Sequence, residues 1–146
     1  MSEAAEFTNP PDSEIRRILA RPTTVAVVGC SADPGRDSLR IAMLLKSKGF
    51  RVIPVNPQLA PDALLDSLGE RCYPTLEAIP GPVEFVDVFR RPEHLPAIAD
   101  EAIKKGARIL WGQLGVVNRE AAARAAEAGL TVVMDRCPAI EYRRLF

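Results

Sequence analysis

The sequence predicts an α/β fold in which about five parallel strands form a doubly wound sheet with helices on both faces. Short, continuous runs of apolar and β-branched residues are typical of strands buried on both faces, and residues 24–29 are the clearest of them. Segments with helical periodicity separate these runs. Strands that alternate with helices favour right-handed crossovers, which place consecutive strands parallel in one sheet.

The first expected element is a helix over 14–20, capped by Asp12 or Ser13 and ended by Pro22. Pro54 cannot donate a ladder hydrogen bond, so the second strand is expected to end early or lie near an edge. Residues 57–82 are the least regular. The other expected elements are strands over 24–29, 51–56, 83–89, 108–111 and 130–134, helices over 39–48, 92–105 and 118–129, short helices around 63–68 and 76–79, and a final coil or short helix.

This order of elements is Rossmann-like, and it predicts that the first strand lies beside the fourth strand, 108–111, at the switch point of the sheet. Ligands of such sheets bind outside the carboxyl ends of the strands at that point. The loops that follow the strands are therefore where a binding site is expected.

Length and charge narrow the possible roles. The 146 residues favour one domain, over 12–146, preceded by a tail over 1–11. The 19 basic and 19 acidic side chains give a net charge of zero, which argues against a general nucleic-acid binder. No apolar run approaches the roughly 20 residues that span a bilayer, and the first residues do not resemble a signal peptide. We therefore expect a cytoplasmic protein with no membrane association.

The three cysteines, Cys30, Cys72 and Cys137, match no zinc motif in their spacing, and with one histidine in the chain no metal site is expected. An odd number of cysteines without an export signal fits reduced thiols. A basic residue, Arg136, precedes Cys137 and favours its thiolate. His94 lies far from Cys137 in sequence and is expected at the surface, so a catalytic Cys–His pair is not predicted.

The loop after the first strand combines groups that favour an anion. Gly29 permits a sharp turn, while Ser31 and Ser38 offer hydroxyl groups. The helix expected to begin near Ser38 would point free N–H groups at the crevice, and Arg36 adds a charged fork suited to phosphate. The loop therefore predicts a phosphate site, although Gly29 and the Pro-Gly pair at 34–35 could simply make the turn.

The next strand-end loops add polar and cationic groups. Arg90 and Arg91 follow the third strand and either face the crevice or form a solvated pair. After the fourth strand, Gln113 can hydrogen-bond a polar ligand and Gly115 permits close backbone approach. Asn118 has a sufficient structural role as a helix N-cap.

The glycine pattern departs from that of dinucleotide-binding domains. The glycines of the first loop do not form G-x-G-x-x-G, and the second strand ends in Asn56-Pro57 where an NAD-binding domain places an acidic residue. Both departures count against NAD. Arg36 leaves NADP as an alternative, so an NAD(P)-linked enzyme or redox sensor stays open.

The strand-end motifs together resemble those of the small bacterial and archaeal CoA-binding proteins, which are similar to the N-terminal CoA-binding domain of the succinyl-CoA synthetase alpha subunit. The resemblance covers about residues 13–145. Two positions depart from the family pattern: Cys30 stands where a small Ala is usual, and Pro138-Ala139 replace a basic residue that often follows Cys137. The motifs that carry it are Val27 to Ser38, Val52 to Pro57, Val86 to Arg91, Gln113 to Gly115 and Met134 to Cys137.

The resemblance implies a domain that holds coenzyme A across the strand ends. It implies that the pyrophosphate is bound by Gly29, Ser31, Arg36 and Ser38. It assigns the nucleotide part to Pro54, Asn56 and Pro57, and the adenine with its phosphates to Val88, Phe89, Arg90 and Arg91. The pantetheine arm would meet Gln113, Gly115 and Asn118, and Arg136 would complete a cationic cluster.

The leading hypothesis is therefore a CoA or acyl-CoA binding module that lacks an evident catalytic constellation, since the synthetase's phosphohistidine domain has no counterpart in this sequence. The protein partner, if any, is not specified by these motifs. The third alternative is thiol chemistry, in which Cys137 or Cys30 forms a mixed disulfide with CoA.

Overall fold

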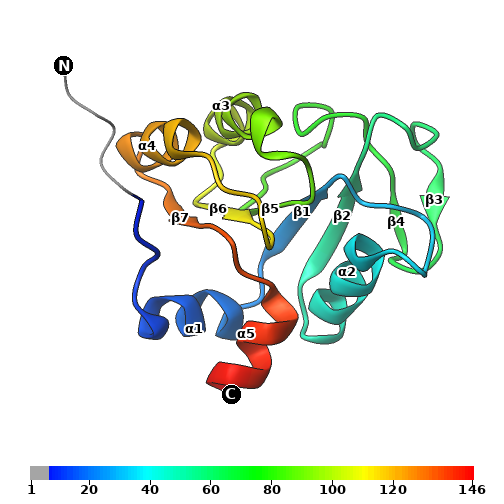
Figure 1. The fold of residues 1–146 in the computed structure, drawn as a ribbon. Helices are drawn as coiled ribbons and strands as arrows, with labels where there is room; N and C mark the ends of the chain where they lie inside the picture. The colour runs from blue at the N-terminus through cyan, green and yellow to red at the C-terminus, as the bar shows by residue number, and fades with distance from the viewer. Residues whose placement is uncertain (1–6) are drawn as a thin grey trace.

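Five parallel strands form the central sheet in the order β2-β1-β5-β6-β7 (Figure 1). The computed structural model describes residues 7–146, and it confirms the predicted Rossmann-like α/β fold. The strands are β1 (Thr24–Val28), β2 (Arg51–Val55), β5 (Phe85–Val88), β6 (Ile109–Gly112) and β7 (Thr131–Val133).

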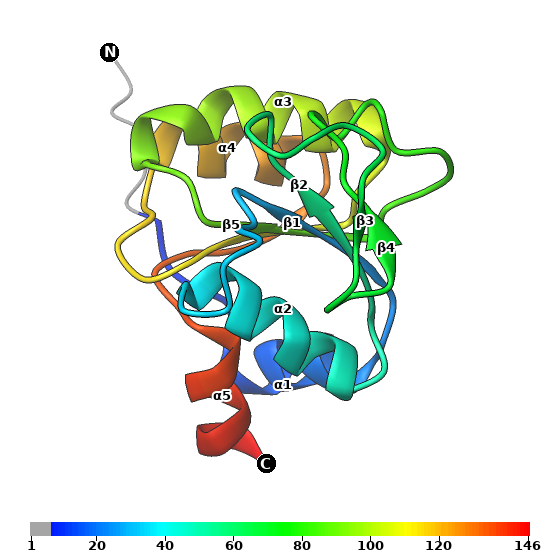
Figure 2. The same cartoon turned by 90° about the vertical axis from the view of Figure 1, so that its right-hand side faces the viewer.

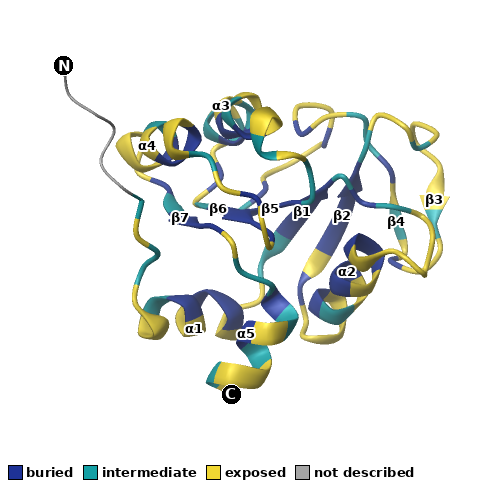
Figure 3. Cartoon of the chain, in the orientation of Figure 1, coloured by how far each residue is buried: buried dark blue, intermediate teal, exposed yellow. Residues whose placement is uncertain are grey.

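Helices cover both faces of this sheet (Figures 1 and 2). One face carries α3 (Leu95–Lys105), preceded by the short 3-10 helix η1 (Pro92–His94), and α4 (Arg119–Glu127). The other face carries α1 (Asp12–Ala20), α2 (Asp37–Ser47) and α5 (Pro138–Leu145). Alternate residues of β1 pack into two separate cores, Ala26 with one layer and Val27 with the other. Burial from both sides explains why the strand is apolar from Val25 to Val28 (Figure 3).

The predicted neighbour of the first strand was wrong. β1 pairs with β2 and with β5, the third of the five sheet strands, and not with β6. The outer edge of β2 is occupied, because the backbone N–H of Tyr73 donates to Pro54 O at 3.1 Å and Asn56 N donates to Tyr73 O at 2.9 Å. The third sheet strand therefore pairs on the free side of β1, and the switch point lies between β1 and β5.

The segment 57–82 also differs from the prediction, because it contains a small antiparallel hairpin instead of two short helices. Its strands are β3 (Leu64–Leu65) and β4 (Glu70–Arg71), joined by a turn through Gly69, whose φ is 67°. Residues 76–79 form a turn, and the prolines at 74 and 80 leave too short a stretch for a helix. Pro54 lies in the edge strand β2, as its missing N–H predicts.

The ends of the elements refine the prediction. α1 begins at Asp12 with Pro11 as its N-cap and no side-chain cap, so Asp12 and Ser13 lie inside its first turn. Asn118 caps α4 as predicted, since its Oδ1 accepts from Ala121 N at 2.9 Å. Within residues 7–146, no helix is both long and apolar enough to cross a membrane.

The amino-terminal segment is tied to the last strand. The side-chain amide of Asn9 donates to Met134 O at 2.9 Å and accepts from Met134 N at 2.8 Å. These two bonds imitate the pairing of a neighbouring strand at the end of β7, which is an edge of the sheet. Residues around Asn9 therefore pack against the domain.

Candidate functional site

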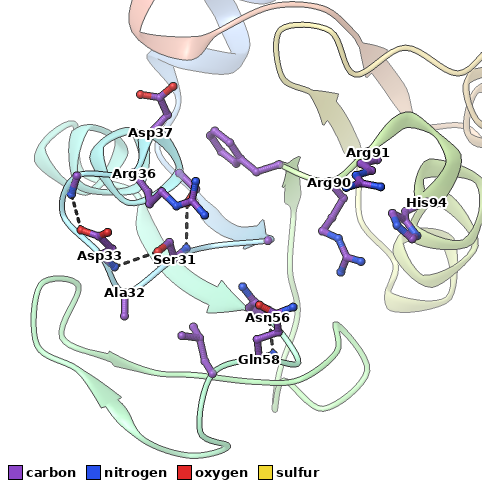
Figure 4. Close-up of a pocket in the computed structure, with 15 residues that line it drawn as sticks. Ser31, Ala32, Asp33, Arg36, Asp37, Asn56, Gln58, Arg90, Arg91 and His94 are labelled. Atoms are coloured by element: carbon purple, nitrogen blue, oxygen red, sulfur yellow. Dashed lines mark hydrogen bonds between the residues drawn. The ribbon is translucent and has the colours of Figure 1, made fainter.

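A cavity of ≈ 970 Å³ opens at the carboxyl ends of β1, β2 and β5 (Figure 4). It lies at the switch point between β1 and β5, where doubly wound sheets bind their ligands. The loops after these three strands, the end of η1 and the start of α2 supply its walls. The lining residues are Gly29, Ser31, Ala32, Asp33, Gly35, Arg36, Asp37, Ser38, Asn56, Gln58, Leu59, Phe89, Arg90, Arg91 and His94.

Gly29 brings two of the loops into contact. Its φ is 88°, and a Cβ atom at this position would lie 2.7 Å from Phe89 O. The N–H of Gly29 also donates to Val55 O at 2.7 Å. Only a residue without a side chain fits this conformation and this spacing, so Gly29 fixes how closely the first and third loops approach.

The loop 31–38 is held by its own polar groups, drawn as dashed lines in Figure 4. Ser31 N donates to Ser38 Oγ at 2.9 Å, and Asp33 N donates to Ser31 Oγ at 3.0 Å. Asp33 Oδ1 in turn accepts from Gly35 N at 2.8 Å. Both serine oxygens act as acceptors here, so their hydroxyl hydrogens remain able to donate to a ligand.

Helix α2 begins at the cavity wall. Its N-cap residue, Arg36, supplies no side-chain hydrogen bond to the first turn. The N–H groups of that turn have no acceptor within the helix, and their dipoles favour a negative charge in front of them. The carboxylate of Asp37 at the rim opposes such a charge, but it is paired with Arg40 one turn later.

Three arginines face this cavity without a carboxylate partner among residues 7–146: Arg36, Arg90 and Arg91. Figure 4 shows Arg36 on one side of the cavity and Arg90, Arg91 and His94 across from it. Two acidic residues line the same walls, and Asp33 and Asp37 are each held by a partner of their own. The arrangement leaves an excess of cationic side chains that can bind phosphate.

Asn56 connects the loop after β1 to the loop after β2. Its Nδ2 donates to Cys30 O at 3.0 Å, and its Oδ1 accepts from Gln58 N at 2.9 Å. The side chain therefore fixes the loop after β1 against the loop after β2. Three of the predicted site residues contribute little side-chain surface, because the side chains of Cys30, Pro54 and Val88 are buried within the sheet and its core.

A second, smaller cavity of ≈ 240 Å³ adjoins the first on the α3 face, and Arg90 and His94 line both. Most of its walls are apolar. Burial raises the pKa of Glu101 in this cavity, and the nearby Glu77 adds to the shift. The remaining lining residues are Val28, Val55, Pro57, Pro74, Thr75, Leu76, Ala97 and Ile98.

The residues predicted after β6 lie outside the lining of both cavities. Gln113 is buried, and its Oε1 has no hydrogen-bond partner among residues 7–146. Gly115 is exposed with a φ of 79°, and its N–H donates to Asp135 Oδ1 at 2.8 Å. Asn118 uses both polar groups in the fold, because its Nδ2 donates to Pro92 O at 3.1 Å while its Oδ1 caps α4.

The loop after β7 is also engaged in structure. The guanidinium of Arg136 lies 3.7 Å from Glu141 Oε1, measured at Nε, and the carbonyl of Arg136 accepts from Trp111 Nε1 at 2.8 Å. Cys137 is half-buried at the start of α5. Arg136 is therefore separate from the three arginines of the cavity.

The two buried thiols are poorly suited to chemistry. Burial raises the pKa of Cys30 to about 12, with smaller contributions from Cys72 and Asp87. Burial likewise raises the pKa of Cys72. Because the thiolate is the reactive form, Cys30 is not a plausible partner for a mixed disulfide near neutral pH.

Two informative residues escaped the sequence prediction. His94 is exposed, as predicted, yet it lines both cavities. The available signal was its position in the segment that connects the third sheet strand to the next helix. Asp87 lies in the middle of the sheet, fully buried, and neither carboxylate oxygen has a partner among residues 7–146. Burial raises the pKa of Asp87 well above its ordinary value. The sequence signal for Asp87 was an acidic residue inside the otherwise apolar run 85–88.

The fold and the position of the cavity define a Rossmann-like domain with a cavity at its switch point. More specifically, the chain belongs to the CoA binding domain family, whose profile matches residues 23–143. This result confirms the family resemblance seen in the strand-end motifs. Among residues 7–146, no three His, Cys, Asp or Glu side chains gather as metal ligands.

Three relatives illustrate the range of this family. The chain is 40% identical over 129 residues to the uncharacterized protein YneT of Bacillus subtilis, which covers 88% of this chain and 92% of YneT. A hypothetical protein from Pyrococcus horikoshii OT3 has a solved structure that superposes with a TM-score of 0.84 at 40% identity, over 96% of this chain and 98% of that one. The ADP-forming acetate–CoA ligase II of Archaeoglobus fulgidus is 32% identical over 94 residues, which make up 63% of this chain and 13% of the ligase.

Proposed function

We propose that the protein is a cytoplasmic binding module for coenzyme A or acyl-CoA that performs no chemistry of its own. Membership of the CoA binding domain family supports a CoA-related role. The three cysteines are free thiols, which favours the reducing cytoplasm. The cavity at the switch point is the site to which we assign the ligand.

The observation that carries the proposal is the set of unpaired cations around the start of α2. CoA bears three phosphate groups, so its site should gather several cations without making the whole protein basic. Arg36, Arg90 and Arg91 supply that charge on a chain whose net charge is zero. No carboxylate among residues 7–146 forms an ion pair with these three side chains.

The residues present fit the pyrophosphate. The absence of a Cβ at Gly29 lets the loops after β1 and β5 meet at the cavity, and Ser31 and Ser38 keep donor hydrogens. We assign the pyrophosphate to this loop, to Arg36 and to the first-turn N–H groups of α2. Asn56 acts as a positioning residue, because its side-chain bonds hold the loops that make the cavity.

The pantetheine arm is assigned to the loop after β6, with one change of roles. Gly115 is exposed and can approach a ligand closely. Asn118 has both of its polar groups engaged in the fold, so we assign it a structural role. Gln113 is buried, and its Oε1, which has no partner among residues 7–146, can accept a hydrogen bond from an amide N–H of the arm.

NAD fits the same cavity less well. An NAD-binding domain places a carboxylate at the end of its second strand to accept hydrogen bonds from the ribose hydroxyls. Here that position is Asn56, whose Oδ1 already accepts from Gln58 N. The neutral and occupied side chain favours CoA over NAD.

Isothermal titration calorimetry with CoA, acetyl-CoA, NAD and NADP tests the proposal. The account expects saturable binding of CoA or acetyl-CoA, with at least about tenfold weaker binding of NAD. Heat from NAD with none from CoA or acetyl-CoA would overturn it. Mass spectrometry of the protein as purified, which detects a retained ligand, gives an independent check.

A further inference from the structure

A groove of ≈ 600 Å³ lies on the face of the molecule that carries α1, α2 and α5. Leu19 near the end of α1, and Leu44 and Lys48 at the end of α2, form one side of it, while α5 forms the other. Figures 1 and 2 show α5 projecting beyond the layer of α1 and α2. The cavity at the switch point lies at the opposite end of α2, a helix about 16 Å long. A ligand in that cavity and a partner in this groove can therefore bind at the same time.

The floor of the groove is apolar and partly aromatic. The ring centroids of Tyr142 and Phe146 lie 5.4 Å apart. The Tyr142 hydroxyl donates to Leu19 O at 2.8 Å, which fixes the ring against α1. Phe146 is 56% exposed, and Leu44 and Ala139 are half-buried in the same groove. Aromatic side chains held in a concave surface are typical of the anchor points that supply most of the affinity in protein interfaces.

Three cations surround this floor. The ammonium nitrogen of Lys48 lies 5.2 Å from the centroid of the Tyr142 ring, and the guanidinium carbon of Arg16 lies 4.7 Å from that of Phe146. Arg143 lines the groove and is exposed. None of the three cations forms an ion pair with a carboxylate among residues 7–146. Their charges are therefore available to an acidic partner.

The carboxylates of the same three helices do not neutralise these cations. Asp12 and Glu141 are both paired with Arg144. Asp37 is paired at the opposite end of α2, and Glu14 lines a separate cavity beside β7. Within the described part of the chain, no acidic side chain lines the groove. The groove thus carries a local positive charge on a chain whose net charge is zero.

Charge decides between the occupants that an apolar groove can accept. In a two-fold dimer formed through this face, both copies would bring the same cations to the interface, and like charges repel. Surfaces that recognise anionic lipids gather about 4–8 Lys and Arg side chains, more than this groove offers. A protein segment with apolar side chains for the floor and carboxylates for the rim satisfies both features of the groove.

We propose that the groove docks an acidic segment of another protein. Apolar side chains of this segment pack on Tyr142 and Phe146. Its carboxylates pair with Arg16, Lys48 and Arg143. The inference goes beyond the proposed function and does not depend on it, because the groove shares no lining residue with the cavity at the switch point.

Phage display of random linear peptides on the immobilised full-length protein tests the proposal. Counter-selection on the double variant Lys48→Glu/Arg143→Glu removes peptides that bind elsewhere, including those at the cationic cavity. The selected peptides should be net acidic and carry large apolar side chains. In fluorescence anisotropy they should bind with a Kd of about 1–100 μM, and high salt should weaken this binding about three- to tenfold.

Single variants separate the groove from general effects of charge. Lys48→Glu and Arg143→Glu should each weaken peptide binding at least about tenfold, because a repulsion replaces an attraction at the rim. Phe146→Ala should weaken it about threefold or more at unchanged net charge. Lys104→Glu is the matched control, because Lys104 is exposed in the last turn of α3, on the opposite face of the sheet; it should bind the peptides as the wild type does. Thermal denaturation establishes that each variant is folded.

The alternative outcomes overturn the proposal in distinct ways. It is wrong if no peptide survives the counter-selection, if the surviving peptides are neutral or basic, or if Lys104→Glu weakens them as much as Lys48→Glu does. A dimer in sedimentation velocity whose dissociation constant changes in Arg143→Glu would assign the groove to a second copy. Binding to vesicles of phosphatidylcholine and phosphatidylserine that is lost in the groove variants would assign it to a membrane. CoA affinity should stay unchanged in all of these variants, and failure of the wild type to bind CoA would bear on the proposed function alone.

Discussion

Two groups of arginines in this molecule stand in opposite electrostatic situations. At the contact between α1 and α5, Arg144 donates to both Asp12 carboxylate oxygens at 2.7 Å and to Glu141 Oε1 at 2.9 Å. The hydrogen bond from Arg144 lowers the pKa of Asp12. At the cavity, Arg36, Arg90 and Arg91 have no such partners among residues 7–146.

The difference separates arginines that stabilise the fold from arginines that await a ligand. The Arg144 group joins the two ends of the domain through charges that satisfy one another. The cavity group forms no ion pairs among residues 7–146, so its side chains add little to the stability of the fold and are available to an anion. Removing a member of each group should therefore have opposite consequences for stability and for binding.

The largest effect is expected at Gly29, because both the cavity and the fold depend on the absence of a side chain at this position. Gly29→Ala forces a side chain into a φ of 88° and places its Cβ 2.7 Å from Phe89 O. We expect a loss of about 2–4 kcal/mol in the free energy of unfolding, measured by urea denaturation, together with a loss of CoA binding. Gly81→Ala is the control, since its φ is 87° but no atom lies within 4 Å of the added Cβ. Equal effects of the two variants would show that the loop contact is unimportant.

Arg36→Ala should act on binding alone. Its guanidinium is exposed and makes no ion pair among residues 7–146, so its loss should leave the urea midpoint nearly unchanged. If it binds a phosphate, CoA affinity should fall by about 1.5–3 kcal/mol in calorimetry. Unchanged affinity would place the phosphate site elsewhere.

Arg144→Ala should act on stability alone. It removes the ion pairs with Asp12 and Glu141 and leaves the buried Glu141 without this partner, so the Tm should fall while CoA affinity stays the same. The pKa of Asp12 is lowered below 3.8 by folding, so its contribution is present above that pH and disappears as the pH falls through the folded pKa. The difference in Tm between wild type and variant should shrink in acid; a constant difference would contradict this account.

Asp87→Asn should raise stability near neutral pH by a smaller amount. Folding raises the pKa of Asp87 above its ordinary value of 3.8, because burial disfavours the charged form. Above that pH the unfolded chain ionises more readily than the folded one, so wild-type stability falls as the pH rises. The variant should be more stable than wild type at pH 7, and the two should converge near pH 4. A gap that is independent of pH would contradict the assignment.

The smallest effect concerns the thiols. Cys137 is half-buried, whereas Cys30 is buried and its raised pKa keeps it protonated. Peptide mass spectrometry after brief maleimide treatment should find Cys137 labelled before Cys30. Any CoA adduct formed under oxidising conditions should disappear in Cys137→Ser and persist in Cys30→Ser; the reverse pattern would contradict the burial of Cys30.

The apolar run of β1 and the strand-end motifs made the fold and the family predictable. Burial on both faces leaves a clear compositional record in residues 24–28. The segment 57–82 was not predictable in the same way, because its hairpin is held by pairing with the edge of β2, a contact distant in sequence. The neighbour of the first strand was predicted wrongly for the same reason, because strand order also depends on contacts between segments that are distant in sequence.

The cavity was predictable where backbone chemistry dictates the residue type. Gly29, Ser31 and Arg36 follow β1, and all three line the cavity. Patterns in sequence do not reveal which side chains meet across elements. The role of His94 between two cavities and the pairing of Arg136 with Glu141 both depend on packing of helices against the sheet, and both required the structure.

A crystal structure of the protein with CoA is the most direct measurement of whether the uncompensated cations hold the ligand. The account predicts phosphate density at the start of α2, within hydrogen-bonding distance of Ser31, Ser38 and Arg36. Density for the ligand elsewhere on the surface, with these side chains unengaged, would contradict it.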